Sequence, residues 1–162
     1  LIRPDSGDGS DPAAIREIDG GAGSDRLVAI HYRDLLIGGV GDDTLVSGQS
    51  SDTLSGGAGN DVFVYASSNS RHYRDVDGVI AGFEIVNDLI DLELFDADFS
   101  LKGDQAFTFI GSATFSGKAG ELRYFHLDGQ TIIEGNADIQ LNAELRITLD
   151  TIVELTIFDF VL

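Results

Sequence analysis

The sequence predicts an all-β protein, a short right-handed parallel β-roll closed by a β-rich C-terminal cap. Two observations predict this fold: a nine-residue repeat in the first third of the chain, and a change from Gly-rich to β-branched and aromatic composition after Tyr65. The repeat takes precedence, because a fixed period indicates stacked units rather than one globular core. We therefore divide the chain into a linker from an upstream domain at residues 1–15, the β-roll at 16–66 and the cap at 67–162.

A nonapeptide organises the first third of the chain. Three intact copies begin with Gly-Gly-x-Gly and lie eighteen residues apart, at 20–28, 38–46 and 56–64. Two worn copies, at 29–37 and 47–55, have lost most of these glycines. Every copy keeps Asp at its sixth position and a large apolar residue at its eighth, a register that a generic Gly-rich linker does not produce. These residues are Asp25, Asp34, Asp43, Asp52 and Asp61, and Leu27, Leu36, Leu45, Leu54 and Phe63.

Each nonapeptide predicts a loop followed by a short strand. Paired glycines can adopt positive φ and turn the backbone so that carbonyl oxygens converge, and the extended stretch that follows points its middle side chain inward. Two nonapeptides form one turn of the roll, so the three intact loops share one edge and the worn loops share the other. Stacked turns then bury an apolar column that no single turn could bury alone.

The intact pattern, for example Gly38-Gly39-Val40-Gly41-Asp42-Asp43, resembles the RTX, or hemolysin-type, calcium-binding repeat. The resemblance implies that sixth-position Asp residues and loop carbonyls of successive same-edge turns enclose Ca²⁺, a hard cation that takes six to eight oxygen ligands. We expect two Ca²⁺ sites, between loops 20–25 and 38–43 and between loops 38–43 and 56–61, with Asp43 serving both. The expected ligands are Gly21, Gly23, Asp25, Gly39, Gly41, Asp43, Gly57, Gly59 and Asp61, with Asp34 and Asp52 as a weaker candidate on the worn edge.

After the repeat, extended runs separated by Gly, Asn or Asp predict further strands. The runs are Val79–Ile80, Leu89–Leu92, Ala106–Ile110, Glu121–Leu127, Thr131–Glu134, Asp138–Leu149 and Thr151–Phe158. Asp128-Gly129 predicts a hairpin between two of them. A helical turn is expected at Asp96–Ser100.

This second half resembles the C-terminal region of serralysin-type secreted proteases and the repeat modules of secreted mannuronan C5-epimerases. The resemblance rests on Val79-Ile80-Ala81-Gly82-Phe83 and Asp88-Leu89-Ile90-Asp91-Leu92. It implies a further set of Ca²⁺ ligands at Asp77, Asp88 and Asp91. The match departs from the family at Gly82, where Asp usually precedes Phe, and at Glu93, where Ser usually follows Leu, and both departures weigh against that third site.

Two basic segments are candidate contacts for an acidic polysaccharide such as alginate. One contains His31, Tyr32 and Arg33 on the worn edge, and the other contains Arg71 and Arg74 after the roll. These residue types hydrogen-bond, stack on sugars and pair with carboxylates. The alternatives are neutral decay of a loop that no longer binds metal and, for the second segment, a solvated loop.

The C-terminal residues Asp159, Phe160, Val161 and Leu162 resemble the uncleaved signal of type I secretion systems. The resemblance lies in an acidic residue followed by apolar residues at the end of the chain. The same residues could form the last strand of the cap, and the two interpretations are compatible.

The composition excludes several classes of function. A formal net charge of −18 excludes nucleic acid and anionic membrane surfaces as partners, because phosphate recognition depends on clustered Lys and Arg. The absence of Cys excludes disulfides and thiolate metal sites. No run approaches the roughly 18 apolar residues of a membrane span, and no nucleophile elbow, zinc motif or phosphate-binding Gly loop predicts catalysis.

We therefore expect a non-catalytic, monomeric calcium-binding module of a secreted bacterial protein, exported by a type I secretion machinery and attached to an upstream catalytic domain. The main interpretation is a polysaccharide-binding regulatory appendage of a mannuronan C5-epimerase. The alternative is a folding and secretion domain of an RTX protease, lipase or adhesin without sugar binding.

Overall fold

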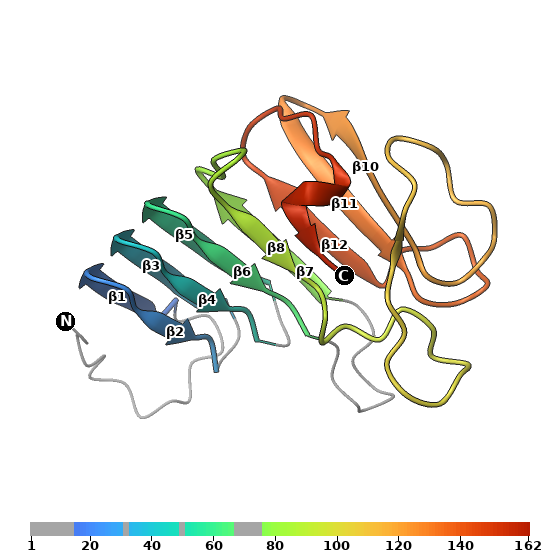
Figure 1. The fold of residues 1–162 in the computed structure, drawn as a ribbon, viewed down its shortest axis with the longest axis horizontal. Helices are drawn as coiled ribbons and strands as arrows, with labels where there is room; N and C mark the ends of the chain where they lie inside the picture. The colour runs from blue at the N-terminus through green and yellow to red at the C-terminus, as the bar shows by residue number, and fades with distance from the viewer. Residues whose placement is uncertain (1–14, 31–32, 49–50, 67–75) are drawn as a thin grey trace.

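The computed structural model describes residues 15–30, 33–48, 51–66 and 76–162, which form short strands joined by tight loops (Figure 1). The strands are β1 (Glu17–Ala22), β2 (Arg26–Val28), β3 (Leu35–Val40), β4 (Thr44–Val46), β5 (Asp52–Ala58), β6 (Val62–Val64), β7 (Val76–Ala81), β8 (Leu89–Asp91), β9 (Thr108–Phe109), β10 (Glu121–Leu127), β11 (Gln130–Asn136), β12 (Leu145–Leu149) and β13 (Phe160–Val161). One 3₁₀ helix, η1 (Ile157–Asp159), precedes β13, and the described residues contain no α-helix.

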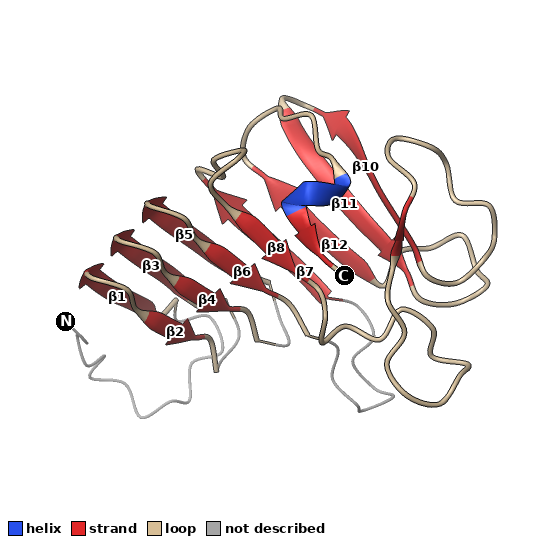
Figure 2. Cartoon of the chain, viewed as in Figure 1, coloured by secondary structure: helices blue, strands red, loops and turns tan. Residues whose placement is uncertain are grey.

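The strands form two sheets. Sheet A has eight strands in the order β1-β3-β5-β7-β12-β11-β10-β9, and sheet B has five in the order β13-β8-β6-β4-β2. Successive strands of the roll alternate between the sheets, and neighbours within a sheet are parallel with an eighteen-residue register, such as Leu36 opposite Leu54 and Leu27 opposite Leu45. The stacked arrows of β1 to β6 in Figure 2 show this arrangement, which confirms the predicted all-β fold with parallel strands.

The eighth-position residues build the core of the roll. Leu36 and Leu54 from sheet A and Leu45 and Phe63 from sheet B are fully buried between the two sheets. Leu27 of the first turn is partly buried and packs against the same core. The alternation of buried and half-buried residues along β3, β4 and β5 is the period of two expected for strands with one face toward a core.

Sheet A continues from the roll into the C-terminal part of the chain. Strand β7 pairs in parallel with both β5 and β12, so the sheet is continuous across the predicted boundary between residues 66 and 67. The predicted hairpin is present, since β10 and β11 pair antiparallel around Asp128 and Gly129. Both turn residues have positive φ, 51° and 85°, as a two-residue hairpin loop of this kind requires.

Three local expectations in this part were wrong. Of Asp138–Leu149 only Leu145–Leu149 is a strand, and Thr151–Phe158 is irregular before it enters η1. The helical turn expected at Asp96–Ser100 is replaced by two side-chain turns. Asp96 Oδ1 accepts the backbone N–H of Asp98 at 3.1 Å, and Asp98 Oδ1 accepts that of Ser100 at 2.9 Å. Asp side chains compete in this way with helical backbone bonds.

Candidate metal centre

The loops of the roll lie on two edges, as the repeat predicted. The intact edge carries loops 20–25, 38–43 and 56–61, which lead from sheet A into sheet B. The worn edge carries loops 29–34 and 47–52, which lead back into sheet A. In Figure 1 the intact loops lie at the arrowhead ends of β1, β3 and β5.

A ladder of Asp residues runs along the intact edge. The backbone N–H of Asp25 donates to Asp43 Oδ1 at 2.8 Å, and that of Asp43 donates to Asp61 Oδ1 at 2.9 Å. The ladder continues where the repeat has ended, because the N–H of Asp61 donates to Asp88 Oδ1 at 3.1 Å. One oxygen of each of the last three carboxylates is therefore fixed by the backbone of the preceding turn.

The other carboxylate oxygen has no donor in the three intact loops. The Oδ2 atoms of Asp25, Asp43 and Asp61 are buried, and none accepts a hydrogen bond within the described part of the chain. The whole residues Asp43 and Asp61 are only 1% and 0% exposed. A buried carboxylate oxygen without a donor is costly, and a cation beside it would remove that cost.

Backbone oxygens converge on the same places. A Cβ on Gly20 would lie 2.9 Å from Asp25 Oδ2 and 2.8 Å from the carbonyl oxygen of Gly38. One turn later, a Cβ on Gly38 would overlap Asp43 Oδ2 and lie 2.5 Å from the carbonyl oxygen of Gly56. Each first-position Gly thus leaves open a cradle between a carboxylate oxygen and a carbonyl oxygen of the next turn.

The donor set has the chemistry of a hard divalent cation site. Among the described residues, no group of three or more His, Asp or Glu side chains is placed to hold a metal ion, so a site here depends on backbone carbonyls. Carboxylate and carbonyl oxygens are the ligands that Ca²⁺ takes, in flexible geometry and without nitrogen or sulfur. The residues present on the intact edge therefore fit Ca²⁺.

Burial makes two carboxylates of the ladder, those of Asp61 and Asp88, difficult to ionise in the absence of a cation. Burial is the largest cause of a raised pKa at Asp61, where the charges of Asp88, Asp43 and Asp42 act in the same direction. The pKa of Asp88 is raised as well, again chiefly by burial. Nearby positive charge on a bound cation would reverse this effect.

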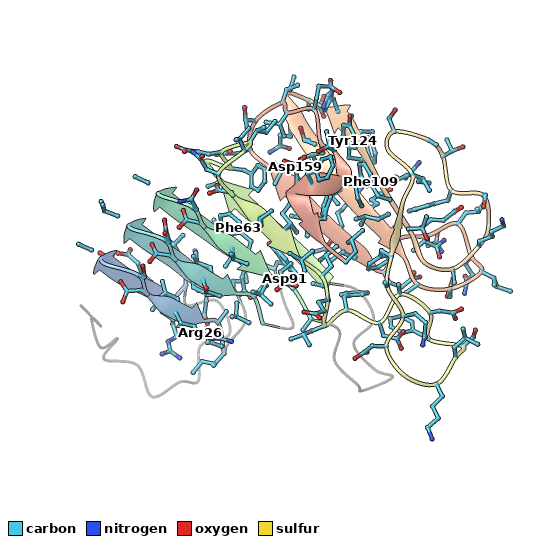
Figure 3. The ribbon with its side chains drawn as sticks, viewed as in Figure 1. Arg26, Phe63, Asp91, Phe109, Tyr124 and Asp159 are labelled. Atoms are coloured by element: carbon cyan, nitrogen blue, oxygen red, sulfur yellow. The ribbon has the colours of Figure 1, made fainter. Side chains whose placement is uncertain are left out.

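The three Asp residues proposed for a third site do not come together. Asp88 belongs to the ladder of the intact edge, and its Oδ2 accepts the N–H of Glu84 at 2.8 Å. Asp77 lies exposed on β7, opposite Arg146. Asp91 (Figure 3) lies at the far end of β8, where its Oδ1 accepts the N–H of Glu93 at 3.0 Å. The fold therefore does not group Asp77, Asp88 and Asp91 as the resemblance implied.

On the worn edge the Oδ2 atoms of both carboxylates have hydrogen-bond donors. Asp52 Oδ1 accepts the N–H of Asp34 at 2.9 Å, while Asp52 Oδ2 accepts the N–H of Gly48 at 2.9 Å and the Ser47 hydroxyl at 3.1 Å. Asp34 Oδ2 likewise accepts the N–H of Ile30 at 3.0 Å. The worn loops therefore turn amides toward Asp52, and both of its oxygens have partners without a metal.

Tyr65 lies next to the last carboxylate of the worn edge, Asp52. Gly78 stands opposite Asp52 in the register, and a Cβ there would lie 2.6 Å from the Tyr65 ring. The Tyr65 hydroxyl is fully buried, finds no hydrogen-bond partner among the described residues, and has a pKa raised by burial and by the charge of Asp52. An aromatic ring thus packs against the backbone of Gly78, close enough to Asp52 to feel its charge.

One of the five residues expected to contact polysaccharide, Arg33, lies within the described residues. His31, Tyr32, Arg71 and Arg74 lie outside the described residues, and Arg33 is exposed with φ of 64°.

Sequence reasoning did not identify a pair of arginines on sheet A. Arg123 on β10 and Arg146 on β12 flank Glu134 on β11, with nitrogen–oxygen distances of 2.6 and 2.9 Å. The Arg123 guanidinium lies 4.4 Å from the Phe115 ring centroid and 5.2 Å from that of Phe125. We call these five residues the arginine face. The register of β10, β11 and β12 brings these residues together, and no local sequence motif predicts that register.

The C-terminal residues form part of the fold. Asp159 is buried, and its Oδ2 accepts the Thr156 N–H at 2.6 Å and the Thr156 hydroxyl at 2.9 Å, which caps η1. Phe160 and Val161 then pair with Ile90 and Asp91 of β8. Figure 3 labels Asp159 in η1. The last-strand interpretation is therefore correct for Phe160 and Val161, whereas Asp159 belongs to η1.

Stacked Gly-Gly-x-Gly-x-Asp turns that join parallel strands of two sheets define an RTX-type calcium-binding β-roll module. The chain belongs to the family described as Peptidase M10 serralysin C terminal, which matches residues 14–162.

The chain is also similar to a solved structure, the AlgE6R3 subunit of a mannuronan C5-epimerase from Azotobacter vinelandii. The identity is 25% over 98% of this chain and 86% of that chain, with a TM-score of 0.62. No curated protein matches the sequence. In the described part of the chain, no helix has the length and apolar character needed to cross a membrane.

Proposed function

We propose that this chain is a non-catalytic module of a secreted protein that folds fully when it binds two Ca²⁺ ions on its intact edge. The observation that carries the proposal is the set of buried Oδ2 atoms of Asp25, Asp43 and Asp61, which have no hydrogen-bond donor in the described chain. One ion would lie between loops 20–25 and 38–43 and the other between loops 38–43 and 56–61. Asp43 would contribute to both.

The proposed mechanism uses the charge of the ladder as a switch. Without metal, the buried carboxylates repel each other across successive turns, and the roll is destabilised. Ca²⁺ supplies the missing positive charge and the missing partner of each Oδ2 atom, so its binding free energy becomes folding free energy. In a low-calcium compartment the chain stays loose, and near-millimolar extracellular Ca²⁺ completes the fold.

Circular dichroism of the full chain with calcium, with magnesium and after chelation tests this proposal. We expect a β spectrum and a cooperative melt in calcium, and loss of part of the β signal after chelation. Magnesium should not substitute, because it demands near-ideal octahedral geometry at shorter distances. A spectrum and melting temperature that do not change on calcium removal would contradict the proposal.

A second candidate function is binding of an acidic polysaccharide such as alginate, as the appendage of an extracellular enzyme. The arginine face favours it, because aromatic rings beside guanidinium groups suit a uronate chain and Arg146 leaves half of its side chain exposed. The similarity to a mannuronan C5-epimerase subunit supports the same context. The alternative remains a folding and secretion domain of a protease, lipase or adhesin.

Isothermal titration calorimetry with alginate oligomers in the presence of calcium separates polysaccharide binding from a folding and secretion role. If the arginine face binds sugar, Arg146→Ala should weaken binding, and Arg26→Ala on β2 of sheet B should not, although it removes the same charge. Equal effects of both variants would indicate only general electrostatics. No binding by a calcium-folded chain would favour the folding and secretion domain, for which residues 159–162 are the proposed type I signal.

A further inference from the structure

The two proposed calcium sites are not equivalent, because their loops are connected differently. At the fifth position of the repeat stand Ser24, Asp42 and Asn60. Asp42 Oδ1 accepts two hydrogen bonds from Asn60, one from its backbone N–H at 2.9 Å and one from its side-chain amide at 3.0 Å. This clamp joins loop 38–43 to loop 56–61 through two residues that are not among the expected metal ligands.

The first site lacks such a clamp. Ser24 occupies the position that would complete it, and within the described residues no side-chain hydrogen bond links Ser24 to Asp42. The clamp of the second site, in contrast, consists of two hydrogen bonds of ordinary length, 2.9 and 3.0 Å.

Loop 56–61 is fixed from its other side as well. The N–H of Asp61 donates to Asp88 Oδ1, and the carbonyl of Asp61 accepts the N–H of Leu89 at 2.8 Å. Asp61 is fully buried, whereas Asp25 of the first loop is partly exposed. The ligands of the second site are thus held in place on both sides before any metal arrives.

We propose that the site between loops 38–43 and 56–61 fills before the site between loops 20–25 and 38–43, with Asp42 and Asn60 as the positioning residues that set this order. The proposal rests on the proposed calcium function. A preorganised site binds more tightly because the loops lose less freedom on binding. At intermediate calcium the module then carries one ion, with the C-terminal turns ordered and the first turn still loose.

A calcium titration of the full chain followed by amide NMR tests the order, with the amides of Gly23 and Gly59 reporting on the two sites. In the unmodified chain we expect the Gly59 amide to reach half-saturation at a lower free calcium concentration than the Gly23 amide. Asn60→Ala removes one of the two clamp bonds, and it should raise the Gly59 midpoint about twofold to tenfold. Ser24→Ala changes the matching position of the first loop and should leave the Gly59 midpoint unchanged.

The outcomes separate the two proposals. If neither amide responds to calcium, the proposed calcium function fails together with the order. If both respond but share one midpoint, or if Asn60→Ala leaves the Gly59 midpoint unchanged, the order fails and calcium binding stands. Dispersed amide signals from β10 to β12 in Asn60→Ala show that the variant has folded.

Discussion

The two edges of the roll carry the same Asp ladder but treat its carboxylates differently. On both edges the N–H of one Asp donates to Oδ1 of the Asp eighteen residues later, at 2.8 to 2.9 Å. On the worn edge the second oxygen of Asp52 accepts two further hydrogen bonds, from Gly48 and Ser47. On the intact edge the second oxygen of Asp43 lies buried without a donor and beside carbonyl oxygens.

The comparison shows that sixth-position Asp belongs to the construction of the roll, and that the loop decides whether its Oδ2 atom has a hydrogen-bond donor. In the Gly-Gly-x-Gly loops Oδ2 is buried without a donor and lies near carbonyl oxygens, as a cation site requires. In the loops without those glycines, backbone amides donate to Oδ2 directly. Four predictions test this difference.

The largest effect should come from removing the shared carboxylate on the intact edge. Asp43→Ala should abolish most calcium-dependent stabilisation, which amounts to about 2.7 kcal/mol per site when free calcium is 100 times the dissociation constant. In chelator the same variant should change stability little, because a buried carboxylate oxygen without a donor is also removed. Thermal melts with calcium and with chelator measure both values.

Asp52→Ala is the matched variant on the worn edge. It leaves three donors without their acceptor and should destabilise the chain by a similar amount with and without calcium. A purely calcium-dependent loss in Asp52→Ala would show that the worn edge binds metal too.

The next largest difference concerns glycine. Gly38→Ala places a methyl group on Asp43 Oδ2 and 2.5 Å from the Gly56 carbonyl oxygen, so the turn must shift and calcium affinity should fall by at least about tenfold, the equivalent of 1.4 kcal/mol. Gly48→Ala on the worn edge meets nothing closer than 3.1 Å and should change stability by less than about 1 kcal/mol. Calcium titration calorimetry measures the calcium affinity of both variants. Similar affinities would contradict a cation site in the cradle beside Gly38.

Acid should raise the melting temperature of the metal-free chain and lower that of the calcium-bound chain. Burial is the main cause of the raised pKa of Asp52, so its protonated form favours folding. In metal-free buffer this contribution is fully present below the ordinary pKa of 3.8 and is lost as pH rises through the raised value. The metal-free chain should therefore melt higher as pH falls from neutral toward that range. In calcium, protons compete with the ion and acid should instead lower the melting temperature.

Asp52→Asn is the control for this pH dependence. It should reduce the acid stabilisation of the metal-free chain, while the contribution of Asp88 persists because its pKa is raised as well. A metal-free chain whose melting temperature falls steadily with acid would contradict the assignment.

The smallest effect concerns the loop that continues the intact edge beyond the repeat. Val86 in this loop has φ of 83° and is 88% exposed, so a β-branched residue adopts the left-handed conformation that Gly57 and Gly59 adopt in the loop before it. Val86→Gly should stabilise the chain by about 1 kcal/mol, or about 2–4 °C in melting temperature. Calorimetry measures the shift, and a lower melting temperature would show that Val86 makes contacts that offset the strain.

The sequence predicted the roll better than the part that follows it, for a physical reason. The positions of Leu36, Leu45, Leu54 and Phe63 follow from a local period, because each turn repeats the contacts of the one before. The parallel pairing of β7 with β12 joins residues about seventy positions apart and has no period. The hairpin at Asp128-Gly129 was predictable because its signal lies within two residues.

The residues of the candidate site were likewise predictable only where a local spacing identifies them. Asp25, Asp43 and Asp61 could be identified from spacing alone, whereas Asp88 joins the ladder 27 residues after Asp61 instead of the eighteen residues that separate the earlier steps. The arginine face was missed because Arg123, Glu134 and Arg146 meet only through the strand register. The amide donors around Asp52 depend on backbone orientation, which the letters of a worn loop do not specify.

The eighteen-residue register also limits how the roll can grow or shrink by duplication. Inserting one whole turn after Val46 would add one strand to each sheet, lengthen the stack by about 4.8 Å and keep both Asp columns intact. Inserting a single nonapeptide there would move every earlier loop to the opposite edge, and Asp43 would align with Asp52. A carbonyl-lined loop would then face an amide-lined one, so modules of this design can change length only in whole turns.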